Sequence, residues 1–354
     1  MQRRILLLVT DLQIGGTPTV VRELALRLSG DEGAYVHVAC LDRWGPVAEQ
    51  LRARGIAVTA LAACSRLDAG VIFRLIRLIR REHIDTVFSF LIHANAAAAL
   101  ASLLTRQVRF LQSIQTTQPH PRWHWMLQRI VRHAAEEIVV PSPSVAQAAR
   151  KWAGIPAERI VVIPNAVEVG EFSLPRRDVP GKRVGFIGRL DPIKRIDDAV
   201  AAISRLGEDV TLDIYGEGRQ RGQIESMVQR LGLGRRVTLH GTVPGSAEAL
   251  SGIDVLVLPS DAEGFGLVLI EAMAAGVPVI GTNVPGIRDV IRDGGNGILT
   301  PPRNPKALAD SIERVLSDAA LRNTLVAGGT ARVQSQFAWP IVYPQYRAML
   351  LGEG

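Results

Sequence analysis

Short apolar runs alternate along the chain with longer segments in which apolar residues recur every three to four positions. The run ILLLV, residues 5–9, has the length of a strand that is apolar on both faces, and residues 19–30, TVVRELALRLSG, have the period of an amphipathic helix. Strands of this kind separated by helices are typical of parallel sheets that helices cover on both sides. The pattern therefore predicts an α/β fold.

The alternation occurs in two series. Six strands are predicted in the first half and six in the second, over residues 4–10, 34–41, 56–61, 84–90, 108–114, 136–142, 183–190, 210–216, 236–241, 254–260, 278–282 and 296–301. Residues 164–183 between the two series are rich in proline, glycine and charge and lack a clear period, which favours a domain boundary. At 354 residues the chain is also long for a single core. We predict two doubly wound, Rossmann-like domains, residues 1–167 and 168–335, whose strand-end loops face a shared cleft.

Composition narrows the class of protein. The chain is 47% hydrophobic and 21% charged, as in soluble globular proteins, and no apolar run reaches the ~18 residues that would span a bilayer. The run at residues 5–9 also lacks the cleavage site of a signal peptide. Cys40 and Cys64 are the only cysteines, which suits a reducing compartment and gives no sign of a disulfide framework. We expect a cytoplasmic protein.

The basic charge is unevenly distributed. The net charge is +7, and lysine supplies only 4 of the 41 basic residues, a bias that can reflect genome composition. Residues 70–135 hold nine arginines and five of the seven histidines but only two acids, Glu82 and Asp85. Arginines and tryptophans on helices in this segment are typical of a helix lying on an anionic membrane, and an ordinary amphipathic surface helix is the alternative. The residues concerned are Arg74, Arg77, Arg81, Trp123, Trp125, Arg129 and Arg132.

The stretch SDAEGFGLVLIEAMAAGVPVI, residues 260–280, places two carboxylates around one helix start. A buried strand precedes it, Gly264 to Gly266 form a turn, and the helix then ends near Gly276. A helix N-terminus offers unpaired N–H groups to an anion or to sugar hydroxyls, and Gly266 lets backbone approach a ligand closely. Glu271 inside the helix needs hydrogen-bond donors. They come either from a nearby arginine or from a ligand that Glu263 also reaches.

Two cations follow another strand in VGFIGRLDPIKRIDDAVAA, residues 184–202. Arg189 and Lys194 lie between the end of this strand and the next helix. Cations at such a position can clamp a diphosphate, although a solvated basic loop has the same composition.

The combination of these two stretches resembles the signature of retaining, nucleotide-sugar-dependent glycosyltransferases of the GT-B fold, glycosyltransferase family 4. The matching segments of the second half are GFIGRLDPIK, IYGEG, LHGTVP, DVLVLPSDAEGFGLVLIEAMAAGVPVI and GNGILTPP. The first half is similar at DLQIGGTPTVVRELA, FLIHANAAAA and VIPNAV, where Ala166 replaces the family's glycine. Gln115 in SIQTTQP stands where many relatives have histidine, so a proton-transfer role there is in doubt.

The resemblance implies roles for particular residues. Arg189 and Lys194 would hold the donor diphosphate, Glu271 the ribose hydroxyls, and Glu263 the hydroxyls of the sugar. The remaining implied contacts are the transferred sugar at His93, the phosphate at Gly15 and Gly16, the base at Gly241 and Val243, and sugar and phosphate at the backbone of Phe265, Gly266, Leu267 and Val268. The C-terminal segment, residues 336–354, carries Trp339, Tyr343 and Tyr346; relatives often pass it back over the first domain, and packing on its own domain is the alternative.

The implied reaction moves a hexose-type sugar from a nucleotide diphosphate-sugar such as a UDP-sugar to a glycan, lipid-linked or small-molecule acceptor. The family retains the anomeric configuration, by front-face attack with the departing phosphate helping to deprotonate the acceptor. Two cations and a helix end suit the charge of that leaving group. No metal or other cofactor is expected, because the sequence shows no Asp-x-Asp at a strand end.

Other sites are disfavoured by particular residues. GEGRQRG, with Gly216 and Gly218, resembles a dinucleotide fingerprint, but Gly222 is one position late and no acid ends the following strand. His120 and His124 have metal spacing without an acid beside them.

Other functions stay open as alternatives: a GT-B nucleotide-sugar epimerase, an inactive sugar-nucleotide sensor and a basic nucleic-acid-binding protein. The last would require aromatic stacking platforms, and the 5% aromatic content provides no such array, so nucleic acid is not expected as a partner.

Overall fold

A computed structural model describes residues 2–42, 44–63, 68, 70–175, 177 and 182–352 and divides the chain into two compact units. Unit 1 comprises Met1–Asn165 and Pro340–Gly354, and unit 2 comprises Ala166–Trp339. Cys64 and residues 176 and 178–181 of the predicted boundary segment lie outside the described residues. Within the described part of the chain, the helices are all too short or too polar to cross a bilayer.

Unit 1 is built on a parallel sheet of seven strands in the order β3-β2-β1-β4-β5-β6-β7. The strands are β1 Arg3–Val9, β2 Ala34–Cys40, β3 Ala57–Ala60, β4 Thr86–Phe90, β5 Arg109–Ser113, β6 Glu137–Val140 and β7 Ile160–Val162. The strand order reverses between the neighbours β1 and β4, so the loops after these two strands lie at the topological switch point.

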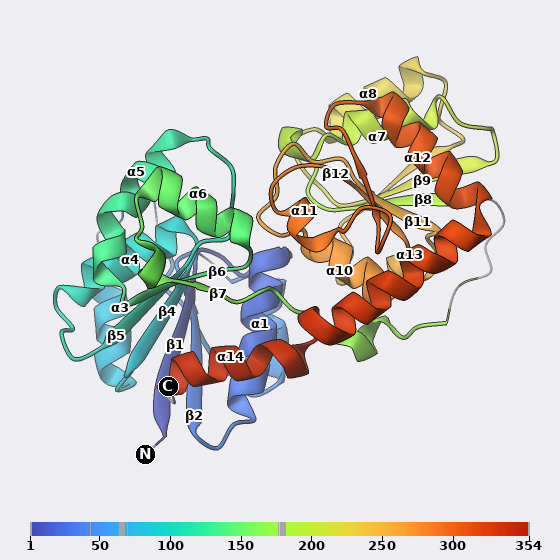
Figure 1. Cartoon of the computed structure of the whole chain (residues 1–354). Coiled ribbons are helices and arrows are strands. Elements are labelled where there is room, and N and C mark those ends of the chain that lie inside the picture. The colour runs from blue at the N-terminus through green and yellow to red at the C-terminus, as the bar shows by residue number, and fades with distance from the viewer. Residues whose placement is uncertain are drawn as a thin grey trace. The chain divides into compact units, whose positions relative to one another are not determined.

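Helices cover both faces of this sheet. They are α1 Gly16–Ser29, α2 Pro46–Ala53, α3 Gly70–Arg81, α4 Ile92–Ser102, α5 Arg122–Val131, α6 Pro143–Ala153 and α14 Trp339–Leu351. Helices α3 and α4 pack on the face that presents Leu6, Leu8 and Val87, whereas α14 packs on the opposite face, where Tyr346 meets Phe88 (Figure 1). The last helix of the chain therefore completes the first unit.

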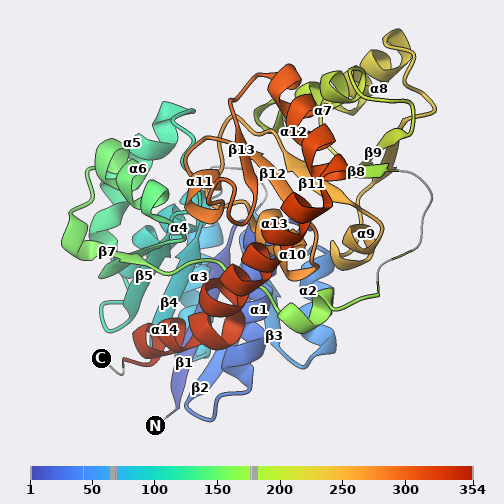
Figure 2. The same ribbon diagram turned by 45° about the vertical axis from the view of Figure 1, so that its right-hand side comes forward.

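Unit 2 repeats the arrangement with six parallel strands in the order β10-β9-β8-β11-β12-β13. The strands are β8 Lys182–Ile187, β9 Val210–Tyr215, β10 Val237–Gly241, β11 Val255–Leu258, β12 Val279–Thr282 and β13 Ile298–Thr300. The helices are α7 Ile196–Ile203, α8 Arg221–Arg230, α9 Ala247–Ser251, α10 Leu267–Ala274, α11 Ile287–Val290, α12 Pro305–Ser317 and α13 Ala319–Arg332. Helix α12 packs beside strands β11 to β13, and α13 packs on α10 and α12 (Figure 2). The switch point of this sheet lies between β8 and β11.

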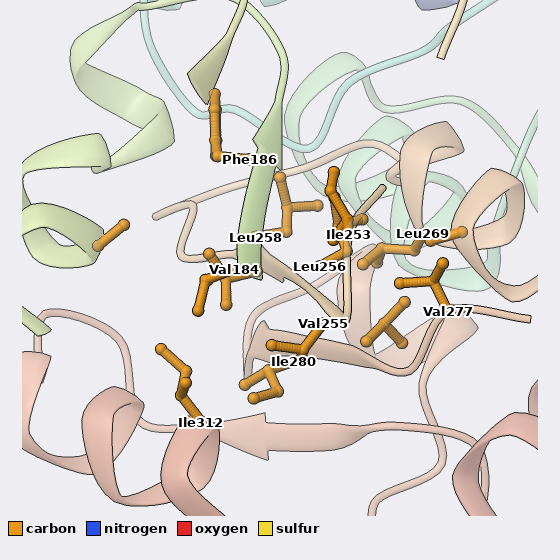
Figure 3. Packing of buried hydrophobic residues seen from close by; sticks show 14 of the residues in the cluster. Val184, Phe186, Ile253, Val255, Leu256, Leu258, Leu269, Val277, Ile280 and Ile312 are labelled. Atoms are coloured by element: carbon orange, nitrogen blue, oxygen red, sulfur yellow. The ribbon is translucent and has the colours of Figure 1, made fainter. Parts of the chain in front are cut away.

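The core of unit 2 explains why its central strands are continuously apolar. All four residues of β11 are buried, with Val255 and Leu256 fully so, and both faces of the strand meet apolar side chains (Figure 3). Parallel strands buried in this way gain stability from both faces. The predicted fold class, two Rossmann-like parallel-sheet units, is confirmed.

One strand was not predicted. β7 has three residues at the edge of its sheet, and Val162 within it is 42% exposed. The run IVVI, residues 160–163, is apolar but short, and it ends at Pro164, where the predicted boundary segment begins, so it was not distinguished from that segment.

Candidate active site

The loops after β8 and β11 meet at the switch point of unit 2. The backbone N–H of Asp261, after β11, donates to the carbonyl of Ile193 at 2.8 Å. Ile193 belongs to a short 3-10 turn, η4 Pro192–Lys194, that follows β8. This hydrogen bond places Lys194 beside Glu263, although the two residues are 69 positions apart.

Lys194 and Glu263 form an ion pair in which both side chains are mostly buried. The Lys194 ammonium donates to Glu263 Oε1, and the side chains are 18% and 11% exposed. The hydroxyl of Ser260, which is fully buried, donates to the same oxygen at 2.8 Å. A largely buried carboxylate needs such donors to offset its lost hydration.

The start of α10 lies directly after this carboxylate. Gly266 caps the helix with φ +80°, a left-handed conformation that favours glycine. Phe265 is buried and meets Phe337 edge-on at a ring separation of 5.4 Å, whereas Leu267 and Val268 in the first turn are half-buried. The predicted backbone donors, Phe265 to Val268, thus lie at the start of a helix that the buried ring of Phe265 anchors.

Glu271 lies on α10 and is connected to another loop. Its Oε2 accepts a hydrogen bond of 2.6 Å from the hydroxyl of Ser246. Ser246 belongs to the loop after β10, which also carries Val243 and follows Gly241, the last residue of the strand, with φ +79°. The structure therefore joins Glu271 to the segment predicted to border the base.

Arg189 occupies a more exposed position than Lys194. Its side chain is 69% exposed and its Nη1 lies 3.2 Å from Asp191, whose other oxygen lies 3.5 Å from Arg219. Arg219 follows β9 in the GEGRQRG segment and was not predicted as a site residue. Its only signal in the sequence was a cation after a strand end, within a motif that resembles a dinucleotide fingerprint.

The glycines of that motif have a packing role. A Cβ on Gly216 would lie 1.9 Å from the carbonyl oxygen of Gly188, and one on Gly218 would lie 2.5 Å from that of Leu190. The loops after β8 and β9 thus touch backbone to backbone, which only glycine permits.

The loop that holds Lys194 ends in a second charged cluster. Arg195 has φ +52° and hydrogen-bonds both oxygens of Asp198, at 2.8 and 3.0 Å. This hydrogen bonding raises the pKa of Arg195, and burial raises the pKa of the neighbouring Asp197. The cluster fixes the backbone directly after Lys194.

In unit 1 the predicted residues also lie at the switch point. Gly15 caps α1, and its carbonyl accepts from the N–H and the hydroxyl of Thr19 at 3.0 and 2.9 Å. Gly16 is exposed, and a Cβ there would meet nothing within 4 Å. His93 lies in the first turn of α4, after Leu91, which has φ +71°.

His93 belongs to an aromatic cluster. Its ring lies 5.9 Å from Trp123 and 5.8 Å from His124, both on α5. Behind this cluster, Asn95 of α4 donates to Gln128 of α5 at 3.0 Å, and Gln128 donates to Gln112 of β5 at 2.8 Å. These buried amides fix α5 against α4 and thereby orient His93.

Gln115 lies in the loop after β5. It donates to the hydroxyl of Ser113 at 2.7 Å and accepts from Asn165 at 3.3 Å, at the end of unit 1. Ala166, which replaces a family glycine, is buried.

The basic segment differs from its prediction in two of its features. Arg74 donates to the carbonyl of Leu61 and pairs with Asp68, and Arg81 pairs with Glu82, so both exposed arginines have an acid partner. Trp125 is 5% exposed and donates to the carbonyl of Gln118. The prediction of an interfacial Trp125 is wrong, because the inner face of α5 includes this residue.

Across the described ranges, no three His, Cys, Asp or Glu side chains gather closely enough to hold a metal ion. His120 is exposed and lies outside the ring cluster of His124.

Two parallel-sheet units, each with polar residues at its switch point, are the architecture of the GT-B fold. Family models match both halves of the chain: Glycosyltransferase Family 4 over residues 14–171 and Glycosyl transferases group 1 over residues 175–332. The chain belongs to glycosyltransferase family 4.

Individual relatives agree with this assignment. The phosphatidyl-myo-inositol mannosyltransferase of Mycobacterium leprae is 32% identical over 285 residues, which are 75% of this chain and 74% of that protein. The exopolysaccharide phosphotransferase of Streptomyces coelicolor is 36% identical over 193 residues, 53% of this chain but 20% of that protein. The chain spans 56% and 58% of two further relatives. A crystal structure of HepE from Anabaena in complex with UDP has the same fold, with a TM-score of 0.87, 21% identity and coverage of 99% and 100% of the two chains.

Proposed function

We propose that the protein transfers a hexose-type sugar from a nucleotide diphosphate-sugar, with retention and without a bound metal, to a glycan, lipid-linked or small-molecule acceptor. The observation that carries the proposal is the meeting of Lys194, Glu263 and the start of α10 at the switch point of unit 2. A UDP-sugar is the proposed donor, because HepE was solved with UDP and with UDP-glucose.

In this proposal the ion pair opens when the donor binds. Lys194 turns from Glu263 to the diphosphate, where Arg189 supplies a second cation, and Glu263 then accepts hydrogen bonds from sugar hydroxyls. Backbone N–H groups from Phe265 to Val268 face the negative charge that develops on the leaving diphosphate.

The remaining contacts follow from the loops around this centre. Glu271 exchanges its hydrogen bond with Ser246 for the ribose hydroxyls, next to a base bordered by Gly241 and Val243. From unit 1, Gly15 and Gly16 contribute backbone to the phosphate and His93 a ring to the transferred sugar. The acceptor attacks from the face of the leaving phosphate, which takes its proton.

We also propose a cytoplasmic location with peripheral contact on the inner face of the membrane. The support is the basic segment 70–135 and the similarity to the phosphatidyl-myo-inositol mannosyltransferase of Mycobacterium leprae, whose name indicates a lipid acceptor.

A thermal-shift panel of UDP-, GDP- and ADP-sugars tests the donor site. A ligand at about a hundred times its Kd stabilises the folded state by about 2.7 kcal/mol, so the matching donor should raise the Tm by about 5–10 °C. Arg189→Ala, Lys194→Ala and Glu271→Ala should each remove most of that rise.

Exposed residues of the same types serve as matched controls: Arg230→Ala, Lys306→Ala and Glu313→Ala should keep the full rise. A full rise in all three site variants would place the donor elsewhere. Release of nucleoside diphosphate only in the presence of acceptor would separate transfer from epimerisation, and an inverted product would contradict retention.

A further inference from the structure

The outer face of helices α3 to α5 in unit 1 carries an unusual number of large apolar side chains. Phe73 on α3 is 70% exposed, Leu103 and Leu104 after α4 are 67% and 58% exposed, and Met126 and Ile130 on α5 are 67% and 71% exposed. With Leu100 and Trp123, they make up seven of the fourteen large apolar side chains that are exposed among the described residues. Apolar side chains concentrated in this way mark a contact surface.

Helix α5 carries large apolar residues on its outer face as well as on its inner one. Its outer positions hold two arginines and three large apolar residues: Arg122, Trp123, Met126, Arg129 and Ile130. Its inner positions include Gln128, whose amide hydrogen-bonds Asn95 and Gln112 in the buried network. The helix thus buries the amide of Gln128 and exposes Met126 and Ile130. If only the burial of apolar surface decided the orientation, these apolar residues would lie inside and the amide outside.

The charges on this face have one sign. Arg77, Arg106, Arg122 and Arg129 are exposed. The two acids of residues 70–135 are engaged inward: Glu82 pairs with Arg4 and Arg81, and Asp85 accepts from the backbone of Arg4. Cations interspersed with apolar side chains complement an anionic lipid surface.

The three helices form one layer that reaches the predicted acceptor side. Arg80 of α3 donates to the carbonyl of Leu104 at 3.1 Å, which ties α3 to the turn after α4. At the other end of α4, the half-exposed Trp123 of α5 contacts the ring of His93.

We propose that this face docks reversibly on an anionic membrane surface, with Phe73, Leu103, Leu104, Met126 and Ile130 entering the interfacial region and the arginines binding headgroups. It deepens the peripheral location proposed above by naming the docking residues, and it is independent of the donor chemistry. A second copy of the chain fits less well, because a two-fold contact would bring like-charged arginine faces together.

Sedimentation with vesicles, without donor or acceptor, tests the proposal. The protein should bind phosphatidylcholine vesicles that contain phosphatidylglycerol, bind pure phosphatidylcholine weakly, and dissociate as salt rises. The double variant Met126→Gln/Ile130→Gln and the triple variant Arg77→Glu/Arg122→Glu/Arg129→Glu should each lower partitioning at least about tenfold. These side chains are exposed, so the thermal unfolding of the variants should match that of the parent protein.

Matched control variants make the same kinds of substitution outside helices α3 to α5. Leu231→Gln/Ile341→Gln removes exposed apolar side chains, and Arg54→Glu/Arg205→Glu/Arg230→Glu makes the same change of net charge. Both should alter partitioning by less than about twofold. Equal loss in the controls, or no binding to phosphatidylglycerol vesicles at low salt, would overturn the proposal. So would a vesicle-free self-association, measured by sedimentation velocity, that the α5 variant abolishes. None of these outcomes affects the donor panel.

Discussion

At the residue scale, the ion pair between Lys194 and Glu263 raises the question why two charged side chains are largely buried. Two largely buried charges cost about as much to desolvate as their attraction returns, so such a pair adds little net stability. Ser260, itself fully buried, adds a hydrogen bond to the same carboxylate oxygen. A ligand that replaces one partner of the pair could therefore bind at little cost to the fold.

Neutralising the pair separates a structural from a binding role. Lys194→Met alone should lower the free energy of unfolding by about 2–3 kcal/mol, because Glu263 is left largely buried with one donor fewer. The double variant Lys194→Met/Glu263→Gln should recover most of that loss, since neither charge remains. Both variants should lose the Tm rise with the donor sugar. A double variant that binds donor like the parent protein would show that the pair serves only the fold.

At the element scale, the loop after β11 is held in place by the start of α11. Gly286 has φ +87°, and a Cβ at this position would lie 2.2 Å from the carbonyl oxygen of Glu263. This contact fixes the backbone of the site carboxylate from a segment that contains no predicted site residue.

Two glycines offer a matched comparison of that contact. Gly294 also has a left-handed φ, +71°, but a Cβ there would meet nothing within 4 Å. Gly294→Ala should cost only the conformational strain of about 1–2 kcal/mol. Gly286→Ala carries at least that strain, since its ψ of −50° lies outside the left-handed helical region, and it must also displace the Glu263 backbone. It should therefore cost about 3 kcal/mol or more and weaken the donor-induced Tm rise. Urea unfolding and the donor panel measure the two effects, and equal losses in the two variants would contradict the packing argument.

The helices and strands could largely be predicted from sequence. The period of the apolar residues indicates which face of a segment is buried, and the positions of the glycines indicate where the chain turns. The start of α10 after Gly266 is an example. The connections between loops could not be predicted, because they depend on the paths of the loops in space. Ser246, after β10, reaches Glu271, after β11, although β9 and β8 lie between these strands in the sheet, and Gly286, after β12, reaches Glu263 in the loop after β11. Helix α5 shows a second limit, since an amphipathic pattern does not say which face is inside when the inner face contains Gln128.

At the scale of the whole molecule, the chain passes between its units twice. The first passage is at Asn165 and the second at Trp339, and the segments beside them pair within unit 2, where Val167 N–H donates to the carbonyl of Phe337 at 2.8 Å. Both ends of the chain consequently belong to unit 1. The last helix contributes Tyr346, which is 1% exposed, to the core of that unit.

The attachment of α14 to unit 1 should depend on pH through Asp31. The Arg347 guanidinium, which hydrogen-bonds this carboxylate, lowers its pKa below the ordinary value of 3.8, with help from the Gly33 N–H and the Tyr343 hydroxyl. A carboxylate with a lowered folded-state pKa binds fewer protons when folded than when unfolded. Its contribution is therefore complete above about pH 4 and is lost as the pH falls through the folded-state pKa.

The variant Asp31→Asn isolates this contribution. At neutral pH it should lower the free energy of unfolding of unit 1 by about 1–2 kcal/mol, a Tm decrease of a few degrees, and speed hydrogen exchange in α14. The Tm difference between parent and variant should stay constant from pH 7 down to about pH 4 and shrink below it, because protonation of Asp31 then removes from the parent the charge that the variant lacks. Asp310→Asn, which changes an exposed pair with Lys306, should show no such difference at any pH. A Tm difference that stayed constant down to pH 3 would mean that Asp31 supports the helix by shape rather than by charge.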